Sequence, residues 1–170
     1  MTPRIAAGLA ALLLANGPPA RADPAAVVRE PNLGAFLAAE AAAAAVTACA
    51  ERGWPVTATV VDRAGQVKAV LRGDGAGPHT VASSLAKAYT SASLRQSTSA
   101  VLDTVQRTPG AQYLPTIEGF LIVGGGLPIR AGDGPGAEVA GAIGVGGAPG
   151  GQLDEQCAEA GIARIRDRLR

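Results

Sequence analysis

His79, the single histidine of the chain, stands between a loop with three glycines and the expected start of a helix. A neutral imidazole nitrogen at such a position can serve as a metal ligand. The next residue, Thr80, is of the type that caps the free N–H groups of a helix start. Those N–H groups also favour anions. His79 and Thr80 together therefore predict a binding site for a metal or an anionic ligand. The alternative is that His79 is an ordinary surface histidine.

Two cations are candidates for holding the acidic groups of a ligand. Lys87 follows His79 by about two helical turns, which places it near the same helix face. Arg72 ends a β-rich run, and its guanidinium matches a carboxylate in bidentate geometry. Lys87 lies among small residues, where burial of its charge would require a partner such as Asp62 or Asp74. An internal ion pair for Lys87 and a surface ion pair for Arg72 are the alternatives.

The two tyrosines, Tyr89 and Tyr113, are further candidate ligands because phenolate oxygens bind ferric iron. Aromatic residues make up only 3% of the chain. Packing in the core or in an interface is therefore the competing interpretation for each tyrosine.

Other kinds of site are not supported by the spacing of residues. The glycine runs 124–126 and 144–151 are not followed by the Gly-Lys-Ser/Thr of a phosphate loop. The two cysteines and one histidine lack a recognisable zinc spacing. The formal net charge is +1, and no basic cluster precedes the last helix. The sequence therefore shows no basic patch of the kind that binds nucleic acid.

The elements that would position these residues follow from hydrophobic pattern and turn chemistry. An alanine-rich helix is expected from 32 or 33 to 52, and a hairpin of two strands, 56–62 and 67–72, comes next. The later elements are helices at 81–93, from 97 or 98 to 105 and at 154–169, and short strands at 120–123, 127–130 and 138–145. Asp154 would cap the last helix. This order predicts a single-domain α+β fold, a mostly antiparallel sheet covered by helices.

The first 22 residues have the features of a secretory signal peptide. Arg4 gives a positive start, residues 5–15 are apolar, and residues 20–22 fit the small-x-small cleavage rule. We therefore expect export to the periplasm or the medium, a flexible arm at 23–32, and one domain at 33–170. The apolar run is too short to span a bilayer, and no membrane insertion is expected.

Cys49 and Cys157 both fall on expected helices. In an oxidising compartment they would form a disulfide if the first and last helices pack side by side. Two separately buried thiols are the alternative.

Two stretches, residues 60–95 and 124–155, together resemble the GlcG/HbpS-like family of small haem-binding and haem-degrading proteins. The matching residues are Asp62, Gly65, Arg72, Asp74, Gly75, Ala76, Lys87, Ala88, Gly124 to Ile129, Gly141 to Gly147, Asp154 and Glu155. The chain departs from the family at Gly146, where members commonly carry a serine. That departure weakens a catalytic role for a hydroxyl at this position.

The resemblance implies a five-stranded antiparallel sheet and a symmetric homo-oligomer. It also implies haem as the ligand, with His79 as the iron ligand and Lys87, Arg72 or Thr80 near the propionates. Oxidative degradation of the haem is a further expectation. The alternative is an accessory or scaffold protein that binds an organic acid, a corrinoid or a partner enzyme and performs no chemistry. The small residues at 137–147 favour a face completed by a neighbouring subunit.

Overall fold

The structure, a computed structural model, describes residue 27 and residues 29–170. The expected signal peptide at 1–22 and part of the arm at 23–32 lie outside the described residues.

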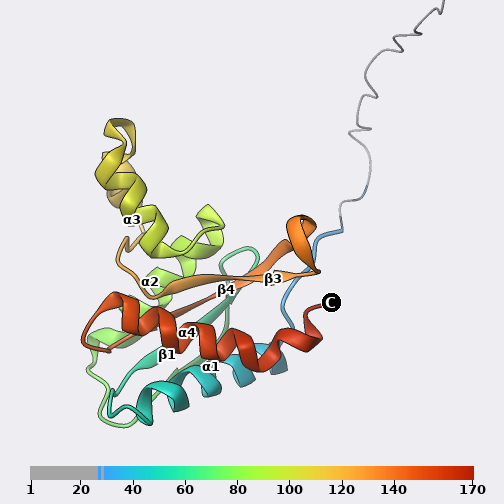
Figure 1. Cartoon of the computed structure of the whole chain (residues 1–170), viewed down its shortest axis with the longest axis vertical. Coiled ribbons are helices and arrows are strands. Elements are labelled where there is room, and N and C mark those ends of the chain that lie inside the picture. Colours follow the sequence, from blue (N-terminus) through green and yellow to red (C-terminus); the bar gives the residue numbers. More distant parts are fainter. Residues whose placement is uncertain (1–26, 28) are drawn as a thin grey trace, which may run out of the picture.

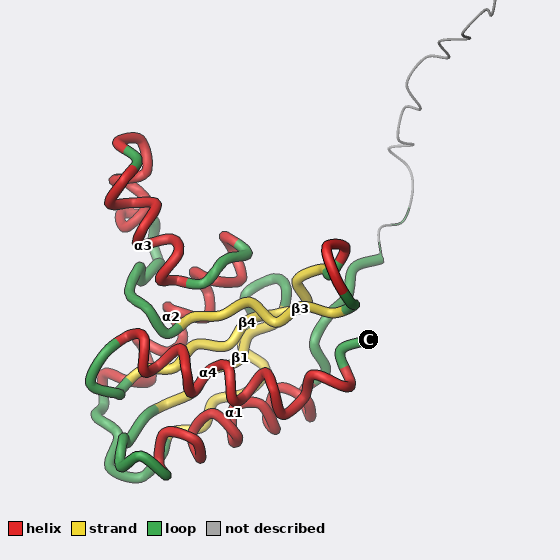
Figure 2. Tube along the Cα trace, viewed as in Figure 1, coloured by secondary structure: helices red, strands yellow, loops and turns green. Residues whose placement is uncertain are grey.

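Four antiparallel strands form one sheet in the order β2-β1-β4-β3. The strands are β1 (Thr57–Asp62), β2 (Val67–Arg72), β3 (Gly126–Ala131) and β4 (Glu138–Gly146). Helices α1 (Ala35–Ala50) and α4 (Gly151–Ile165) lie side by side on one face, and α2 (His79–Leu94) covers the other (Figures 1 and 2). The expected single-domain α+β fold is confirmed.

Helix α3 (Thr98–Arg107) and the 3-10 helix Pro109–Thr116 extend away from the sheet beyond α2 (Figure 1). Two further 3-10 turns, Gly134–Gly136 and Arg166–Arg168, precede β4 and follow α4. No helix among residues 27 and 29–170 has the length and apolar character needed to cross a membrane.

The sheet has four strands rather than the expected five. The strand expected at 120–123 is absent, because this segment runs along α2. The backbone N–H of Leu121 donates to Thr90 Oγ1 on α2 at 2.9 Å instead of to a neighbouring strand. The following glycines then pass close to helices: a Cβ on Gly126 would lie 2.4 Å from the carbonyl oxygen of Lys87. The contacts of this segment with α2 thus take the place of strand pairing.

Two helices begin earlier than expected. Helix α2 begins at His79 rather than at residue 81, and α4 begins at Gly151 rather than at Asp154. Neither helix has a side-chain cap, because Pro78 and Gly150 occupy the two N-cap positions. The expected hairpin and the start of α3, capped by the Ser97 hydroxyl, are confirmed.

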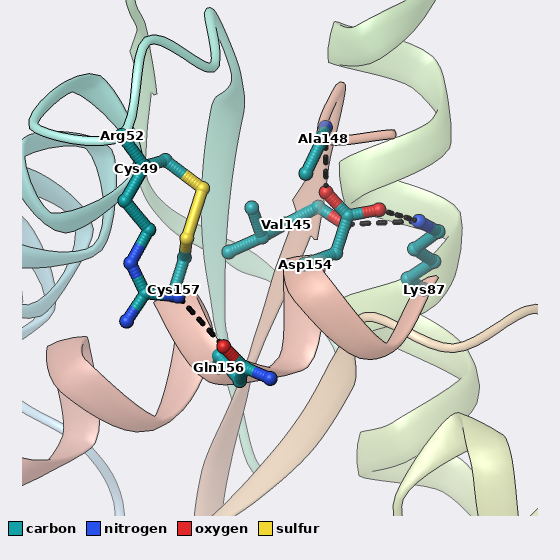
Figure 3. The surroundings of a disulfide bond; sticks show 8 residues. All are labelled: Cys49, Arg52, Lys87, Val145, Ala148, Asp154, Gln156 and Cys157. Atoms are coloured by element: carbon teal, nitrogen blue, oxygen red, sulfur yellow. Dashed lines mark hydrogen bonds and ion pairs between the residues drawn. A yellow bond between two sulfur atoms is a disulfide. The ribbon is translucent and has the colours of Figure 1, made fainter. Parts of the chain in front are cut away.

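A core of small residues joins α1, α4 and the sheet. The alanines on the inner side of α1 allow close approach of α4, where a Cβ on Gly161 would lie 2.5 Å from the Ala41 carbonyl oxygen. The same contact brings Cys49 and Cys157 together in a disulfide with a Cα–Cα distance of 5.6 Å (Figure 3). The disulfide expected if these helices pack together is therefore present.

On the opposite face, α2 packs closely against β4. A Cβ on Gly144 would lie 2.1 Å from the carbonyl oxygen of Ser84 and 2.5 Å from the amide nitrogen of Ala88. The small residues of β4 thus make room for α2 of the same chain. They do not form an open face that a neighbouring subunit must complete.

Candidate functional site

His79 is exposed at the first position of α2. Its ring lies over Gly77, where an added Cβ would approach Cε1 to 2.7 Å and Nδ1 to 2.9 Å. The imidazole makes no hydrogen bond with the described residues, so its nitrogens are available to a ligand.

Thr80, by contrast, faces inward and is 1% exposed. Its hydroxyl donates to the carbonyl oxygen of Gly77 at 2.7 Å. The 2.6 Å contact with Thr57 Oγ1 is therefore donated by Thr57, because a hydroxyl has only one proton to give. Thr80 thus closes the first turn of α2 and joins it to β1. The expectation that Thr80 is an N-cap is wrong, because the helix begins one residue before it.

Arg72 supports the loop that leads to His79. Its Nε donates to the carbonyl oxygen of Ala76 at 3.0 Å, and Nη2 donates to the same oxygen. Arg72 is also paired across the sheet with Thr57, the hydrogen-bond partner of Thr80. The structure therefore brings Arg72, His79 and Thr80 together around the loop 73–78.

Lys87 lies apart from this group, on the inner side of α2 (Figure 3). Its Nζ lies 2.8 Å from Asp154 Oδ2 and donates to the carbonyl oxygen of Val145 at 3.0 Å. Lys87 is 5% exposed and Asp154 3%. The ammonium is thus engaged in the internal ion pair that the sequence left as the alternative. Its partner comes from α4 and is neither of the two aspartates expected from the sequence.

Asp154 connects three parts of the chain. Besides Lys87 on α2, its carboxylate accepts the N–H of Ala148 at 3.0 Å, in the loop between β4 and α4. Burial raises the pKa of the Asp154 carboxyl above its usual value, and the hydrogen bond and charge of Lys87 act in the opposite direction. The sequence singled out Asp154 as a cap and gave no signal for this pair, because the two residues are 67 positions apart.

Tyr89 lines a groove of about 740 Å³ on the outer side of α2. The opposite wall is the turn between β1 and β2. The surface is mostly small or apolar, from Gly65, Val67, Ala82, Leu85, Ala86 and Gly119, and Gln66 and the Glu118 carboxylate add polar groups to it. Tyr113, the other candidate tyrosine, is 66% exposed on the 3-10 helix that extends away from the sheet. Of the two phenols, Tyr89 is therefore the one that borders a cavity.

A second groove of about 710 Å³ lies on the other side of the hairpin, between α1 and β2. Trp54 lines it, with the Arg52 guanidinium 5.4 Å from the ring centroid. Arg72 lines the same groove together with the carboxylates of Glu51 and Asp74. This groove thus carries more charge than the one beside Tyr89.

Acidic and sulfur ligands are not gathered into a metal centre in the described part of the chain. Among residues 27 and 29–170, no group of three or more His, Cys, Asp or Glu side chains is arranged to hold a metal ion.

The structure is that of a small α+β protein whose candidate ligands are spread over α2, the end of β2 and the 3-10 helix after α3. The family model described as "Haem degrading protein HbpS-like" matches residues 33–163. The chain belongs to this family, and the resemblance noted in the sequence is confirmed.

Individual relatives agree with this assignment. Streptomyces reticuli HbpS, solved as a double mutant, is 40% identical with a TM-score of 0.72, over 86% of this chain and 96% of that one. An uncharacterized 15.0 kDa protein from the dhaT-dhaS intergenic region of Citrobacter freundii is 39% identical over 117 residues, 66% of this chain and 78% of the relative. PduOC, solved in complex with haem, has the same fold at 24% identity and a TM-score of 0.67, over 79% of this chain and 95% of that one.

Proposed function

We propose that this chain is an exported haem-binding protein. The observation that carries the proposal is the match to the haem-degrading family over residues 33–163, which includes all four strands and most of α4. Two features of the chain suit haem. The described residues hold an imidazole and a phenol that are free to bind iron, His79 and Tyr89. They also include an open groove of about 740 Å³, within the range of cofactor sites.

The residues around the loop 73–78 would have defined roles toward haem. His79 offers an exposed imidazole as an iron ligand, and Arg72 a guanidinium for a propionate. Thr80 would act indirectly, because its buried hydroxyl holds the first turn of α2 against β1. Lys87 would have to leave its ion pair with Asp154 to reach a propionate. Bound haem would supply the iron and porphyrin chemistry, and the protein would supply placement.

A haemin titration of the purified protein with its disulfide intact tests the proposal. We expect saturable binding of haemin, seen as a sharp Soret band and as quenching of the fluorescence of Trp54, the single tryptophan. A signal that rises in proportion to haemin without saturation would contradict haem binding. That result would favour an accessory or scaffold protein that binds an organic acid, a corrinoid or a partner enzyme.

We further propose that the protein degrades the bound haem oxidatively. Gly146 has no hydroxyl, but a Cβ there would lie 2.7 Å from Ser83 Oγ. Ser83 on α2 therefore offers a hydroxyl at the place where the family commonly has a serine. With a reductant and dioxygen present, we expect the Soret band of the haemin complex to decay faster than that of free haemin. Equal decay rates for the complex and for free haemin would mean that the protein binds haem without degrading it.

Export and assembly are proposed on separate grounds. The sequence of residues 1–22 and the disulfide between Cys49 and Cys157 both suit an oxidising compartment outside the cytoplasm. For a closed homo-oligomer, edge strand β2 offers a contact, with Val70 46% and Leu71 41% exposed. The intact mass of the exported protein tests cleavage after residue 22, and light scattering tests assembly. An uncleaved protein in the cytoplasm, or a monomer at micromolar concentration, would contradict the respective proposal.

A further inference from the structure

We infer that the groove between α2 and the β1–β2 turn holds the haem ring, and that the Tyr89 phenol oxygen, rather than His79, binds the iron. This inference rests on the proposed haem binding and adds the position of the ring and the identity of the ligand.

The ring of Tyr89 is held in one place by the backbone around it. A Cβ on Gly65 would lie 2.7 Å from Tyr89 Cδ2, and one on Gly119 would lie 3.3 Å from Cδ1. Phe120 adds an edge-to-face contact with ring centroids 6.0 Å apart. The absence of side chains at the two glycines thus leaves a slot for the ring of Tyr89. The slot positions the phenol without using its hydroxyl, which makes no hydrogen bond with the described residues.

The walls of the groove suit a flat apolar ligand. Ala82 and Ala86 lie seven and three positions before Tyr89, so the three side chains share one stripe of α2. Their methyl groups leave the stripe shallow, and Leu85, 36% exposed, borders it. Val67 on β2 borders the opposite side and is 50% exposed. A porphyrin laid on this surface would remove these apolar groups from water, which is the main source of affinity for such a ring.

Neither His79 nor the groove beside Trp54 combines an iron ligand with an apolar surface. His79 begins α2 ten residues before Tyr89, about 15 Å along the helix axis, and its ring is folded back over Gly77. It does not line the groove. The groove beside Trp54 contains no histidine, tyrosine, cysteine or methionine side chain that could bind the iron. An iron ligand and an apolar surface of sufficient size meet only at Tyr89 among the described residues.

A set of ligand variants and then a pair of groove variants test the inference in the full chain with haemin as the probe. Tyr89→Phe removes only the hydroxyl, so we expect a shifted Soret band, loss of the phenolate-to-iron absorption and affinity at least about tenfold weaker. Tyr89→His should restore a strong Soret band with the spectrum of a nitrogen ligand. Tyr113→Phe removes the other phenol of the chain, which is 66% exposed and lies outside the groove, and as the matched control it should leave spectrum and affinity unchanged. His79→Ala then separates the two candidate ligands.

The second pair tests the groove itself. Ala82→Trp fills the groove beside Tyr89, and Thr47→Trp places the same bulk in the groove of similar volume beside Trp54. We expect haemin affinity to fall at least about tenfold in the first variant and to stay unchanged in the second. Circular dichroism and denaturant unfolding of each variant check that the fold is kept.

Several results would overturn the inference. A spectral change in His79→Ala but not in Tyr89→Phe would assign the iron to the loop 73–78. Unchanged binding in Ala82→Trp would place the ring elsewhere. A lower oligomer mass in Ala82→Trp with unchanged haemin binding would make the groove a contact between copies of the chain. In each of these cases the wild type still binds haemin; absence of binding in the wild type would refute the proposed function itself.

Discussion

Replacing Lys87 by methionine should destabilise the protein strongly, because it leaves the Asp154 carboxylate buried without its counter-charge. With an effective dielectric constant of about 20, unit charges 2.8 Å apart attract by about 6 kcal/mol. Moving the two ions out of water costs several kcal/mol each, so the intact pair contributes little net stability. In Lys87→Met the cost of burying the Asp154 charge remains, but the attraction to the lysine ammonium is lost. We therefore expect a loss of about 3–5 kcal/mol in the free energy of unfolding.

The chain contains a matched control for this experiment. Lys68 and Asp62 form an ion pair at 3.8 Å in which Lys68 is 32% exposed. Lys68→Met should cost at most about 1 kcal/mol, because water screens this pair. Guanidinium chloride unfolding at neutral pH, followed by far-UV circular dichroism with the disulfide intact, compares the two variants. If Lys87→Met lost no more stability than Lys68→Met, the reasoning on burial would be refuted.

A second replacement identifies the source of the loss. In Lys87→Met/Asp154→Asn the amide still accepts the N–H of Ala148 and carries no charge. The double variant should therefore recover at least half of the stability lost in Lys87→Met. An additive loss in the double variant would mean that the lysine stem, and not the charge, contributes the stability.

The pH dependence provides an independent measurement of the same group. Because burial raises the pKa of Asp154, the folded protein binds a proton at a higher pH than the unfolded chain. The contribution of this group to the free energy of unfolding therefore decreases as pH rises from the ordinary aspartate pKa of 3.8 through the raised pKa. The penalty of Lys87→Met should thus shrink toward acid pH, and Asp154→Asn should remove this dependence. A penalty that stays constant with pH would contradict the assignment.

Three further changes test the packing, each measured by denaturant unfolding. Reducing the bond between Cys49 and Cys157, or replacing both by alanine, should cost about 4–5 kcal/mol, because the bond closes a loop of 108 residues in the unfolded chain; a loss below about 1 kcal/mol would contradict this. Gly144→Ala should cost more than about 3 kcal/mol, because its Cβ meets the backbone of α2, whereas Gly136→Ala, which meets open space, should have little effect. Thr80→Val should cost about 1–3 kcal/mol by leaving a buried hydroxyl of β1 without its acceptor, and a neutral result would remove that hydrogen bond from the account.

Local chemistry explains which elements could be predicted from the sequence. In the β1–β2 turn, Asp62 Oδ1 accepts the N–H groups of Ala64 and Gln66, both at 2.9 Å, and Gly65 has a φ of 78°. All of these contacts lie within five residues. The hairpin and the α3 cap are determined at this range, and their prediction succeeded.

The unsuccessful predictions involve distant partners. Asp154 has the sequence context of a cap, yet its carboxylate pairs with Lys87, and only the tertiary fold brings the first turn of α4 within reach of Lys87 on α2. The segment 120–123 has strand composition, but it runs along α2, where Thr90 provides a partner for its backbone. The groove at Tyr89 depends on Gly65 and Gly119, from two separate turns. None of these contacts leaves a local pattern in the sequence.

The hydroxyl contacts between β1 and α2 also have a mechanical consequence. Thr57 meets Thr80 at 2.6 Å, and Thr59 meets Ser84 at 2.7 Å. Two residues of strand span about 6.8 Å and four residues of helix span about 6.0 Å. The spacing of the two hydroxyls on β1 therefore nearly equals the spacing of their partners on α2. Sliding α2 by a full turn would leave at most one of the two contacts, so together they favour a single register of α2 on β1. A displacement of α2 at the loop before it would therefore either break these hydroxyl contacts or carry β1 with it.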